Sequence, residues 1–419
     1  MTDTVAVLGA GMVGVACAIE LQRRGYDVTL YDRSAPGRET SYGNAGVIAR
    51  SSLMPFNHPG LWATLPRLMV NQSAGFRYDP AFIARNLPWA FGFLSRARPS
   101  DFEQTTTALD ALIRLSTQEH LRLLGEAGAT QRLRANGWLF LYRSEAGFAA
   151  SRLARATYDK FGIDTQTLGP TELSELEPQL KPIFARALWI KDSYSVDDPG
   201  RVVEAYAQLF AARGGRIAQA HINTLMRAQS DGGWRLLDAG GTSHAASQVV
   251  IALGPWSKAF LAQSLGIDVP MAFERGYHMH YGAEQGAVLQ RPVYDTAGAY
   301  VLSPMEQGLR LTTGVQLSAH DAPRDTVQLD LAERAARQAF PLGDRLEPQA
   351  WLGSRPTLPD CRPIIGACPR QAGLWLAFGH QHIGFSTGTG TAALLGSLMA
   401  GESAAIDAAP FRPERFLRA

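Results

Sequence analysis

Three glycines and one acidic residue near the start of the chain have the types and spacing of a nucleotide-binding turn. Gly9, Gly11 and Gly14 follow an apolar run, and Asp32 comes eighteen residues after Gly14. Gly9 permits a tight turn, Gly11 lets the backbone approach a pyrophosphate, and Gly14 allows a helix to pack closely on a strand. A carboxylate at the position of Asp32 accepts hydrogen bonds from ribose hydroxyls. The pattern predicts a dinucleotide site, and a glycine turn that serves packing alone is the alternative.

A strand, a helix and a second strand must position these residues. We expect strands at 5–8 and 27–32 and a helix from Val13 to Arg24, with Met12 and Val13 at its start. The N-terminal end of a helix carries unpaired N–H groups and a positive dipole end, and both favour a diphosphate.

A polar, glycine-punctuated loop follows at 33–46. Serine, asparagine and glycine in such a loop offer backbone and side-chain donors to the remaining phosphate and ring atoms. The candidate residues in and just after it are Arg33, Thr40, Ser41, Asn44, Ala45, Gly46 and Val47. A plain surface loop is the alternative interpretation.

A later segment also has the pattern of an apolar strand that ends at glycine. The run 248–253 is fully apolar after Gln248 and ends at Gly254, as expected of a central parallel strand that meets a ligand. The pattern over 271–316 predicts strands and turns of an antiparallel sheet. Helices are expected at 104–127, 145–161, 199–213, 330–340 and 390–400.

Length and composition limit the class of protein. A chain of 419 residues exceeds one ordinary core, so we expect two domains. With 40 basic and 38 acidic residues, there is no electrostatic argument for binding of nucleic acid.

Cys17, Cys361 and Cys368 form no metal-binding pattern, so no metal is expected and a reducing cytoplasm fits best. Cys17 is interpreted as a small core residue. No run is apolar and long enough to span a bilayer, and Asp3 and the glycines argue against a secretion signal.

Aromatic and basic residues are interleaved between residues 51 and 100. Three interpretations are open: a lid over a pocket, a surface that rests on a membrane, or helices packed on the core, of which the last is favoured. The aromatic residues are Trp62, Phe76, Phe82, Trp89, Phe91 and Phe93, and the basic ones include Arg67, Arg85, Arg96 and Arg98.

Seven motifs follow one another from residue 5 to about 401: GAGMVG with Asp32, ETSYGNAG, SVDDPGRVV, ALGPWS, RGYHMHY, GSRPTLPD and GHQHIGFSTGTG. Together they resemble the FAD-dependent D-amino acid oxidase and dehydrogenase family. The resemblance is strongest to bacterial D-amino acid dehydrogenases and D-hydroxyproline dehydrogenases. The resemblance implies an α/β fold: a Rossmann-like FAD-binding domain assembled from 1–50, 195–260 and 345–419, and an α+β substrate domain, 51–194 and 261–344, with an antiparallel sheet.

The same resemblance implies roles for further residues. Gly384, Phe385, Ser386 and Thr387 would face the flavin ring at the start of the last helix, whose positive end favours a reduced, anionic ring. Arg355 resembles the family arginine that pairs with the substrate carboxylate, and Tyr277 resembles the tyrosine that assists it; a surface salt bridge is the alternative for Arg355.

Histidines supply further candidates. His380 and His382 would touch substrate or tune the flavin, although loop histidines bonded to backbone are commoner. His278 and His280 alternate with Tyr277, so they point away from the pocket if Tyr277 points into it. No cysteine is placed to attach the ring, so FAD is expected to be non-covalent, and Cys361 stands where the family often has glycine.

The expected activity is oxidation of the Cα–N bond of a D-amino acid or a cyclic imino acid of the D-proline or hydroxyproline type, by hydride transfer to the flavin. Electrons would pass to a quinone or another acceptor that is not oxygen. The enzyme is expected in the cytoplasm, in contact with the inner face of the plasma membrane, and as a homo- or hetero-oligomer. The alternatives are a glycine or sarcosine type of amine oxidase, an FAD-carrying subunit of a larger dehydrogenase complex, and an NAD-dependent dehydrogenase.

Overall fold

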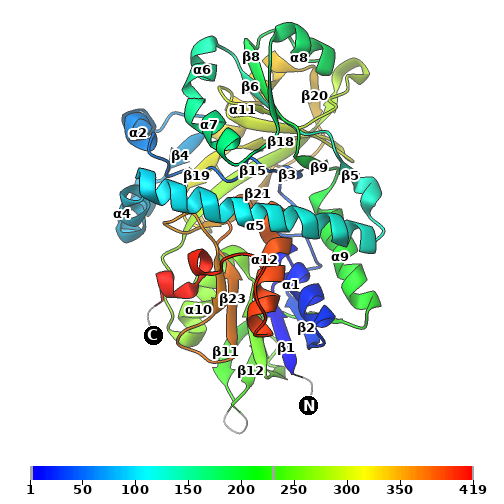
Figure 1. Cartoon of the computed structure of the whole chain (residues 1–419), viewed down its shortest axis with the longest axis vertical. Coiled ribbons are helices and arrows are strands. Elements are labelled where there is room, and N and C mark those ends of the chain that lie inside the picture. Colours follow the sequence, from blue (N-terminus) through cyan, green and yellow to red (C-terminus); the bar gives the residue numbers. More distant parts are fainter. Residues whose placement is uncertain (1–2, 229–231, 418–419) are drawn as a thin grey trace.

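Two large β-sheets, one above the other in Figure 1, organise the chain. The computed structural model describes residues 3–228 and 232–417. The first sheet has the strand order β10-β2-β1-β14-β23-β22, parallel except for its last strand. Its strands are β1 (Thr4–Leu8), β2 (Asp27–Asp32), β10 (Arg216–Gln219), β14 (Gln248–Ile251), β22 (Ile364–Ala367) and β23 (Leu374–Phe378). The predicted β1, helix and β2 unit is therefore present, within about a residue of its expected bounds.

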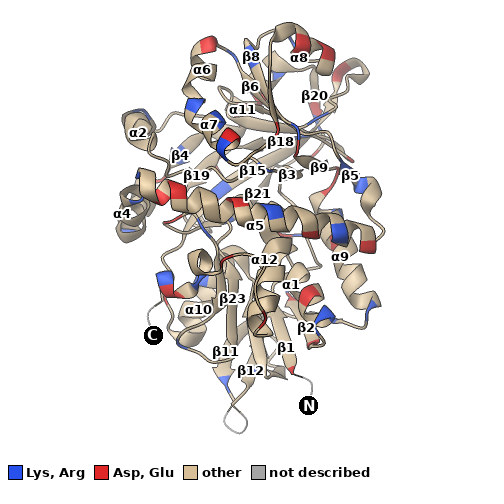
Figure 2. Ribbon diagram, viewed as in Figure 1, with Lys and Arg blue, Asp and Glu red and all other residues tan. Residues whose placement is uncertain are grey.

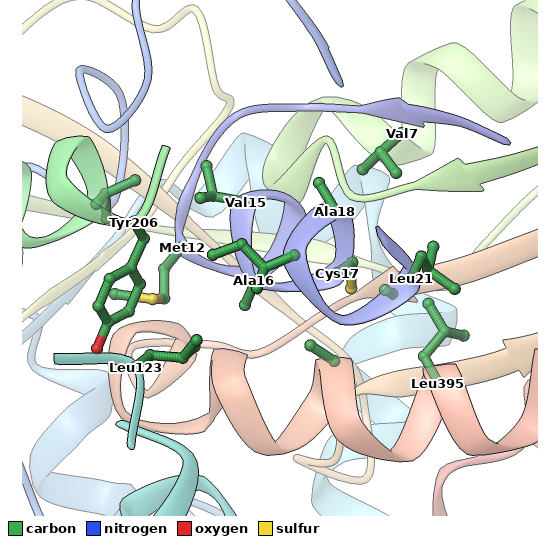
Figure 3. Close-up of a cluster of buried hydrophobic side chains, with 14 of the residues drawn as sticks. Val7, Met12, Val15, Ala16, Cys17, Ala18, Leu21, Leu123, Tyr206 and Leu395 are labelled. Carbon is green, nitrogen blue, oxygen red and sulfur yellow. The ribbon is translucent and has the colours of Figure 1, made fainter. Parts of the chain in front are cut away.

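Helix α1 (Met12–Arg23) is almost entirely buried because it packs between the first sheet and other helices. Figure 3 shows the cluster where α1 meets α12 (Gly384–Met399), with Leu395 of α12 and Leu123 of α5 (Pro99–Glu126) close by. Cys17 lies inside this cluster with no exposed surface, which confirms its interpretation as a core residue. Burial of the apolar faces of α1 and α12 fixes the two helix N-termini on the same side of the sheet.

The second sheet is mainly antiparallel, as the pattern over 271–316 predicts. Its longest strand is β15 (Ala272–Ala283), which pairs with β18 (Gly308–Thr313) and β21 (Trp351–Thr357). Helix α11 (Val327–Ala339) packs on one face of this sheet. The other strands are β4 (Phe76–Tyr78), β6 (Trp138–Tyr142), β7 (Thr165–Leu168), β8 (Arg186–Ile190), β16 (Val293–Asp295), β17 (Tyr300–Met305), β19 (Val315–Leu317) and β20 (Leu342–Arg345).

The position of β21 corrects one expected domain boundary. A third segment of the FAD-binding domain was expected to begin at 345, but β21 (Trp351–Thr357) lies in the second sheet, paired along its length with β15. The chain returns to the first sheet only with β22 at Ile364. Residues 351–357 therefore belong structurally with the antiparallel sheet, while the other expected boundaries stay predictions.

Smaller elements connect the two sheets. Helix α5 crosses the molecule between them (Figure 1) and packs on α12. The remaining helices are α2 (Leu61–Met69), α3 (Pro80–Arg85), α4 (Leu87–Ser95), α6 (Glu145–Ala150), α7 (Arg152–Lys160), α8 (Pro170–Leu176), α9 (Pro199–Ala212) and α10 (Ser257–Leu265). The remaining strands are β3 (Val47–Ile48), β5 (Leu133–Arg134), β9 (Tyr194–Val196), β11 (Ile222–Arg227), β12 (Trp234–Asp238) and β13 (Ser243–Ala246).

The aromatic and basic region 51–100 forms short helices whose side chains divide between core and surface. Phe82 and Trp89 are buried against strands of the second sheet, whereas Trp62 is 51% and Phe91 77% exposed. The favoured interpretation, helices packed on the core, thus describes only part of the segment. Acidic and basic residues elsewhere are interspersed (Figure 2). Among the described residues, no helix is long and apolar enough to cross a membrane.

Candidate active site

A cavity of about 800 Å³ runs between the two sheets. One end is formed by the glycine turn and the ends of β1 and β2, and the other by the face of the second sheet that carries Gly276 and Arg355. Most residues of the loop 39–47, the start of α12 and part of strand β21 border its middle. A cavity of this size, at the carboxyl ends of parallel strands, is where open α/β sheets bind their ligands.

The glycine turn has the geometry that its sequence predicts. Gly9 has a φ of +105°, and a Cβ there would lie 2.4 Å from the carbonyl oxygen of Ala252. A Cβ on Gly14 would lie 1.7 Å from the carbonyl oxygen of Gly9. These two glycines are required by the close packing of strand, turn and helix. Gly11 borders the cavity, so a side chain there would occupy the space in which a pyrophosphate binds.

Asp32 organises the turn as well as offering a ribose ligand. Its carboxylate accepts hydrogen bonds from the backbone N–H of Ala10, at 2.6 Å, and of Ser34, at 2.9 Å. Burial raises the pKa of Asp32, and these two hydrogen bonds oppose that rise. The N–H of Met12 donates to the Ser41 hydroxyl, which ties the predicted loop to the start of α1. The turn thus fits a dinucleotide: a cradle without side chains, a helix N-terminus and a carboxylate at the strand end.

Arg310 fixes the loop from the side of the second sheet. Its Nη1 donates to the carbonyl oxygens of Tyr42 and Asn44, both at 2.7 Å, and its Nε donates to His280 Nε2 at 3.0 Å. His280 Nδ1 in turn donates to Glu347 at 2.5 Å, so the hydrogen bonds define its tautomer. Burial and the adjacent guanidinium lower the pKa of His280, which keeps it neutral. Both nitrogens of His280 are therefore engaged in holding Arg310.

The start of α12 closes the cavity opposite this loop. Gly384, Phe385 and Ser386 border the cavity, and the Ser386 hydroxyl donates to the carbonyl oxygen of Val47 at 2.8 Å. The N-terminal end of this 16-residue helix is therefore directed at the middle of the cavity. Its dipole stabilises negative charge placed there.

Arg355 lies on the cavity face of the second sheet. Its guanidinium packs over Gly276, where an added Cβ would lie 2.3 Å from Nη2, and Nη1 donates to the carbonyl oxygen of Gly314 at 3.1 Å. Burial lowers the pKa of Arg355. Among the described residues, no carboxylate lies within ion-pair distance of this guanidinium. A partly buried guanidinium that borders a cavity without an ion pair is suited to bind a carboxylate ligand.

The structure corrects the role expected for Tyr277. Tyr277 borders the cavity, but its hydroxyl accepts from the backbone N–H of Asp325 at 2.8 Å and contacts Arg275 and Gln316. Because side chains alternate along a strand, Tyr277 points to the α11 side of β15, opposite Gly276 and the Arg355 guanidinium. His278 and His280 lie on the same side of β15 as Gly276, although neither borders the cavity, and the His278 ring stacks on Trp351 with centroids 4.8 Å apart.

His380 and His382 both border the cavity, with different partners. His380 bonds the Thr391 hydroxyl at 2.9 Å, whereas His382 packs against the Phe56 ring with its Nδ1 unpaired. Burial lowers the pKa of each to about 3, and the charge of Arg355 contributes at His382. Both imidazoles are neutral at pH 7, so they accept or share hydrogen bonds there without adding positive charge.

Most predicted cofactor residues border this one cavity. They are Gly9, Gly11, Met12, Val13, Asp32, Arg33, Thr40, Ser41, Asn44, Ala45, Val47, Gly254, Gly384, Phe385 and Ser386. Gly14, Gly46 and Thr387 do not border it and support the elements that do. Arg310, Glu274 and Trp351 were not identified as site residues from the sequence. The only signal for them would have been their register in the second sheet, which the sequence does not give. Also missed were Trp138, Phe140, Tyr158 and Tyr294, which come from strands and a helix far from any motif.

Comparison with known proteins gives one consistent result. A family profile described as FAD dependent oxidoreductase matches residues 4–398. The chain is 30% identical to a D-amino-acid oxidase of Bradyrhizobium diazoefficiens over 99% of both chains, and 28% identical to a D-amino acid dehydrogenase of Chromohalobacter salexigens over 96% of this chain and 97% of that one. A crystal structure of glycine oxidase from Geobacillus kaustophilus has a TM-score of 0.74 at 22% identity and covers all of both chains. At that identity the last likeness concerns the fold.

Proposed function

The chain belongs to the family of FAD-dependent oxidoreductases and is an FAD-binding enzyme, and on that premise we propose that it oxidises the Cα–N bond of a D-amino acid. The proposal keeps the cyclic imino acids, of the D-proline and hydroxyproline type, within the substrate range. It assigns the electrons to a quinone or another acceptor that is not oxygen. The observation that carries it is the partly buried Arg355 guanidinium, which borders the FAD cavity and has no ion-pair partner among the described side chains.

Arg355 would hold the substrate carboxylate in this proposal. Two parallel N–H donors match the two oxygens of a carboxylate, and burial strengthens the attraction. Gly314 and Gly276 lie against the guanidinium and contribute no side chain that would compete with a ligand for it. His382, which lies beside Arg355 and is neutral, would contact the amino group, and His380 would support the wall of the cavity.

The proposed reaction needs little acid or base chemistry from the protein. Bound FAD supplies the acceptor for a hydride. In the substrate, the Cα–H bond breaks with its electron pair, nitrogen gives up a proton and a C=N bond forms; water then releases ammonia and a keto acid from an open-chain imine. The protein positions the Cα–H bond and excludes solvent, and the positive end of α12 favours negative charge in the middle of the cavity.

An exposed apolar patch, Trp62, Met69, Val70, Leu87 and Phe91, supports the choice of a membrane-bound acceptor. Each of these side chains is 51% to 77% exposed. The patch lies on and beside α2 and α4, and Trp62 of α2 donates to the carbonyl oxygen of Ala97, just after the end of α4. Residues 59–98 contain five arginines and a single acidic residue, Asp79. Apolar side chains flanked by arginines suit the surface of an anionic bilayer, where a quinone would be reached.

Anaerobic bleaching of the flavin tests the reaction class. The flavin-loaded protein is mixed, without oxygen, with D- and L-amino acids, prolines, hydroxyprolines, glycine and sarcosine, while the oxidised flavin band is followed. Rapid bleaching by D-amino acids or D-prolines is the expected result. Fastest bleaching by glycine or sarcosine would replace the proposal by the amine oxidase alternative. No bleaching by the whole panel would favour an FAD-carrying subunit that needs partners.

A further inference from the structure

The cavity extends beyond Arg355 into a space whose walls are aromatic. We define the aromatic chamber by its lining residues Met54, Trp138, Phe140, Tyr158 and Tyr294. They come from the loop after β3, from β6 and β16, and from α7. In Figure 1, β6 and α7 lie in the upper half of the molecule, far from β1 and β2, where the glycine turn binds the nucleotide. The chamber is therefore at the substrate end of the cavity.

Strand register places the chamber and Arg355 on the same face of one sheet. His278 pairs with Thr312, Thr312 with Val301, Val301 with Tyr294, and Tyr294 with Phe140. Directly paired residues share a face, so this row continues the cavity face that begins with Gly276 and Arg355 on neighbouring strands. The Arg355 guanidinium bonds carbonyl oxygens next to the end of β18, and Tyr294 is two strands away, about 10 Å at ordinary strand spacing. That distance suits a large side chain whose carboxylate is bound at Arg355.

The rings of the chamber form a preformed aromatic wall. Trp138 and Phe140 meet edge to face with centroids 4.6 Å apart, and Phe140 and Tyr294 do so at 5.4 Å. Helix α7 covers them, with Tyr158 fully buried and Ala154 bordering the cavity. Edge-to-face ring walls favour another aromatic ring, which adds attraction beyond its buried area.

Charge is absent from the chamber. Among the described residues that line the whole cavity, the carboxylates are Asp32 and Glu39, and both lie at the nucleotide end with Arg33. Burial raises the pKa of Tyr294 to about 12, so its phenol stays neutral. A substrate with a charged side chain would lose its hydration here without an ion-pair partner.

We infer that the substrate of this enzyme is an amino acid with a large aromatic side chain, which the aromatic chamber receives while Arg355 holds the carboxylate. This inference rests on the proposed function. Within the substrate range of that proposal, it predicts that aromatic amino acids are preferred over glycine, sarcosine, alanine and proline, which are too small to reach Tyr294 from Arg355. Phe140 and Tyr294 are the residues that determine this specificity, and Ala154 sets the depth of the chamber.

The first test compares substrates of the holoenzyme. kcat/KM is measured with D-phenylalanine, D-tryptophan, D-alanine, D-proline, D-aspartate and D-lysine. We expect an aromatic substrate to exceed D-alanine by about 100-fold, because a single methylene in an apolar pocket is already worth about tenfold or more. Equal or better turnover of D-alanine, D-proline, D-aspartate or D-lysine would overturn the inference while leaving the proposed function intact.

The second test does not depend on turnover. Binding of 3-phenylpropanoate and of propanoate, neither of which has an amine to oxidise, is followed by the shift of the flavin spectrum. A Kd at least tenfold lower for 3-phenylpropanoate is expected. Equal Kd values would refute the chamber as a ring site, whatever the outcome of the bleaching panel.

A substitution that fills the chamber gives the third test. Ala154→Phe should lower the ratio of kcat/KM for D-phenylalanine over D-alanine at least tenfold and raise the Kd of 3-phenylpropanoate. Ala150→Phe, an exposed position on the neighbouring helix α6, is the matched control and should change neither. Flavin content reports folding, and Phe140→Leu offers an independent variant that removes a ring without adding volume. A flavin-loaded Ala154→Phe enzyme with an unchanged ratio would contradict the inference.

Discussion

Glu274 lies directly opposite Arg355 in the register of β15 and β21, so a buried carboxyl and a partly buried guanidinium share one face of the sheet. No ion pair joins them, and one carboxyl oxygen of Glu274 has no hydrogen-bond partner. Burial raises the pKa of Glu274 to about 7, while Thr357 and Arg355 oppose the rise. The carboxyl therefore changes charge beside the proposed carboxylate ligand within the physiological range.

Substrate binding should weaken as the pH rises through about 7. Ionised Glu274 neutralises part of the field of Arg355, so KM for an amino acid should increase above that pH. Glu274→Gln removes the titration and should flatten this step in the pH profile of kcat/KM. A step that survives in Glu274→Gln would assign it to another group.

The same pKa shift predicts a stability change. The folded-state pKa lies above the ordinary value of 4.5, so the stabilisation is complete below pH 4.5 and is lost as the pH rises through about 7. Its size is about 3 kcal/mol at most. Unfolding curves at pH 5 and pH 8 should show a smaller loss for Glu274→Gln than for the wild type.

Arg355→Ala should raise KM for an amino acid about 100-fold and leave the flavin bound. Two hydrogen bonds to a charged carboxylate are worth about 3 kcal/mol, and Arg355 belongs to the second sheet rather than to the glycine turn. Arg324→Ala is the control, since Arg324 donates to the carbonyl oxygen of Ala350 outside the cavity. Loss of flavin from Arg355→Ala would remove its assignment as the carboxylate ligand.

Gly11→Val should give colourless protein. Its side chain would enter the space for the pyrophosphate and its Cβ would press on the Ser41 hydroxyl, 3.2 Å away. Gly125→Val, in α5 where an added Cβ meets nothing within 4 Å, should stay yellow. The flavin absorbance per protein, measured after purification, compares the flavin content of the two variants. A yellow, active Gly11→Val enzyme would disprove the site.

The nucleotide end of the cavity was predictable because its determinants are local. Gly9, Gly14 and Asp32 act within one strand, helix and strand unit, so their spacing in the sequence carries their geometry. The antiparallel sheet and the FAD family were likewise foreseen, and the structure and the comparisons confirm them.

The substrate end was not predictable in the same way because long-range register decides it. Tyr277 and His278 are neighbours in a strand, and only the pairing of β15 with β18 and β21 determines which of them lies on the face of the sheet that carries Arg355. A shift of the strand register by one residue moves every side chain to the opposite face of the sheet, and for this reason the expectation for Tyr277 was wrong. Cys361, which replaces a common glycine, proves to have a φ of +58°, a left-handed conformation that explains glycine at that position.

Arg310→Leu should weaken FAD binding at least tenfold without contacting the substrate carboxylate. The carbonyl oxygens of Tyr42 and Asn44 would lose their donor, and the loop that borders the middle of the cavity would lose its link to the second sheet. Fluorescence titration of apoprotein with FAD measures the effect. Arg227→Leu, which removes a guanidinium that is bonded to Ala372 and does not border the cavity, is the control. Equal FAD affinity in both variants would mean that the loop holds its shape without Arg310.

Phe91→Glu should abolish binding to anionic vesicles and leave oxidation with a soluble dye unchanged. Phe91 is 77% exposed at the centre of an arginine-flanked segment, so a carboxylate there opposes both the apolar and the electrostatic attraction. Val288→Glu, at a valine that is 62% exposed elsewhere on the surface, controls for added charge. Co-sedimentation with vesicles that contain phosphatidylglycerol, at low and at high salt, measures binding. If the wild type does not sediment with these vesicles, the apolar patch does not dock on a bilayer and the membrane quinone loses its structural support.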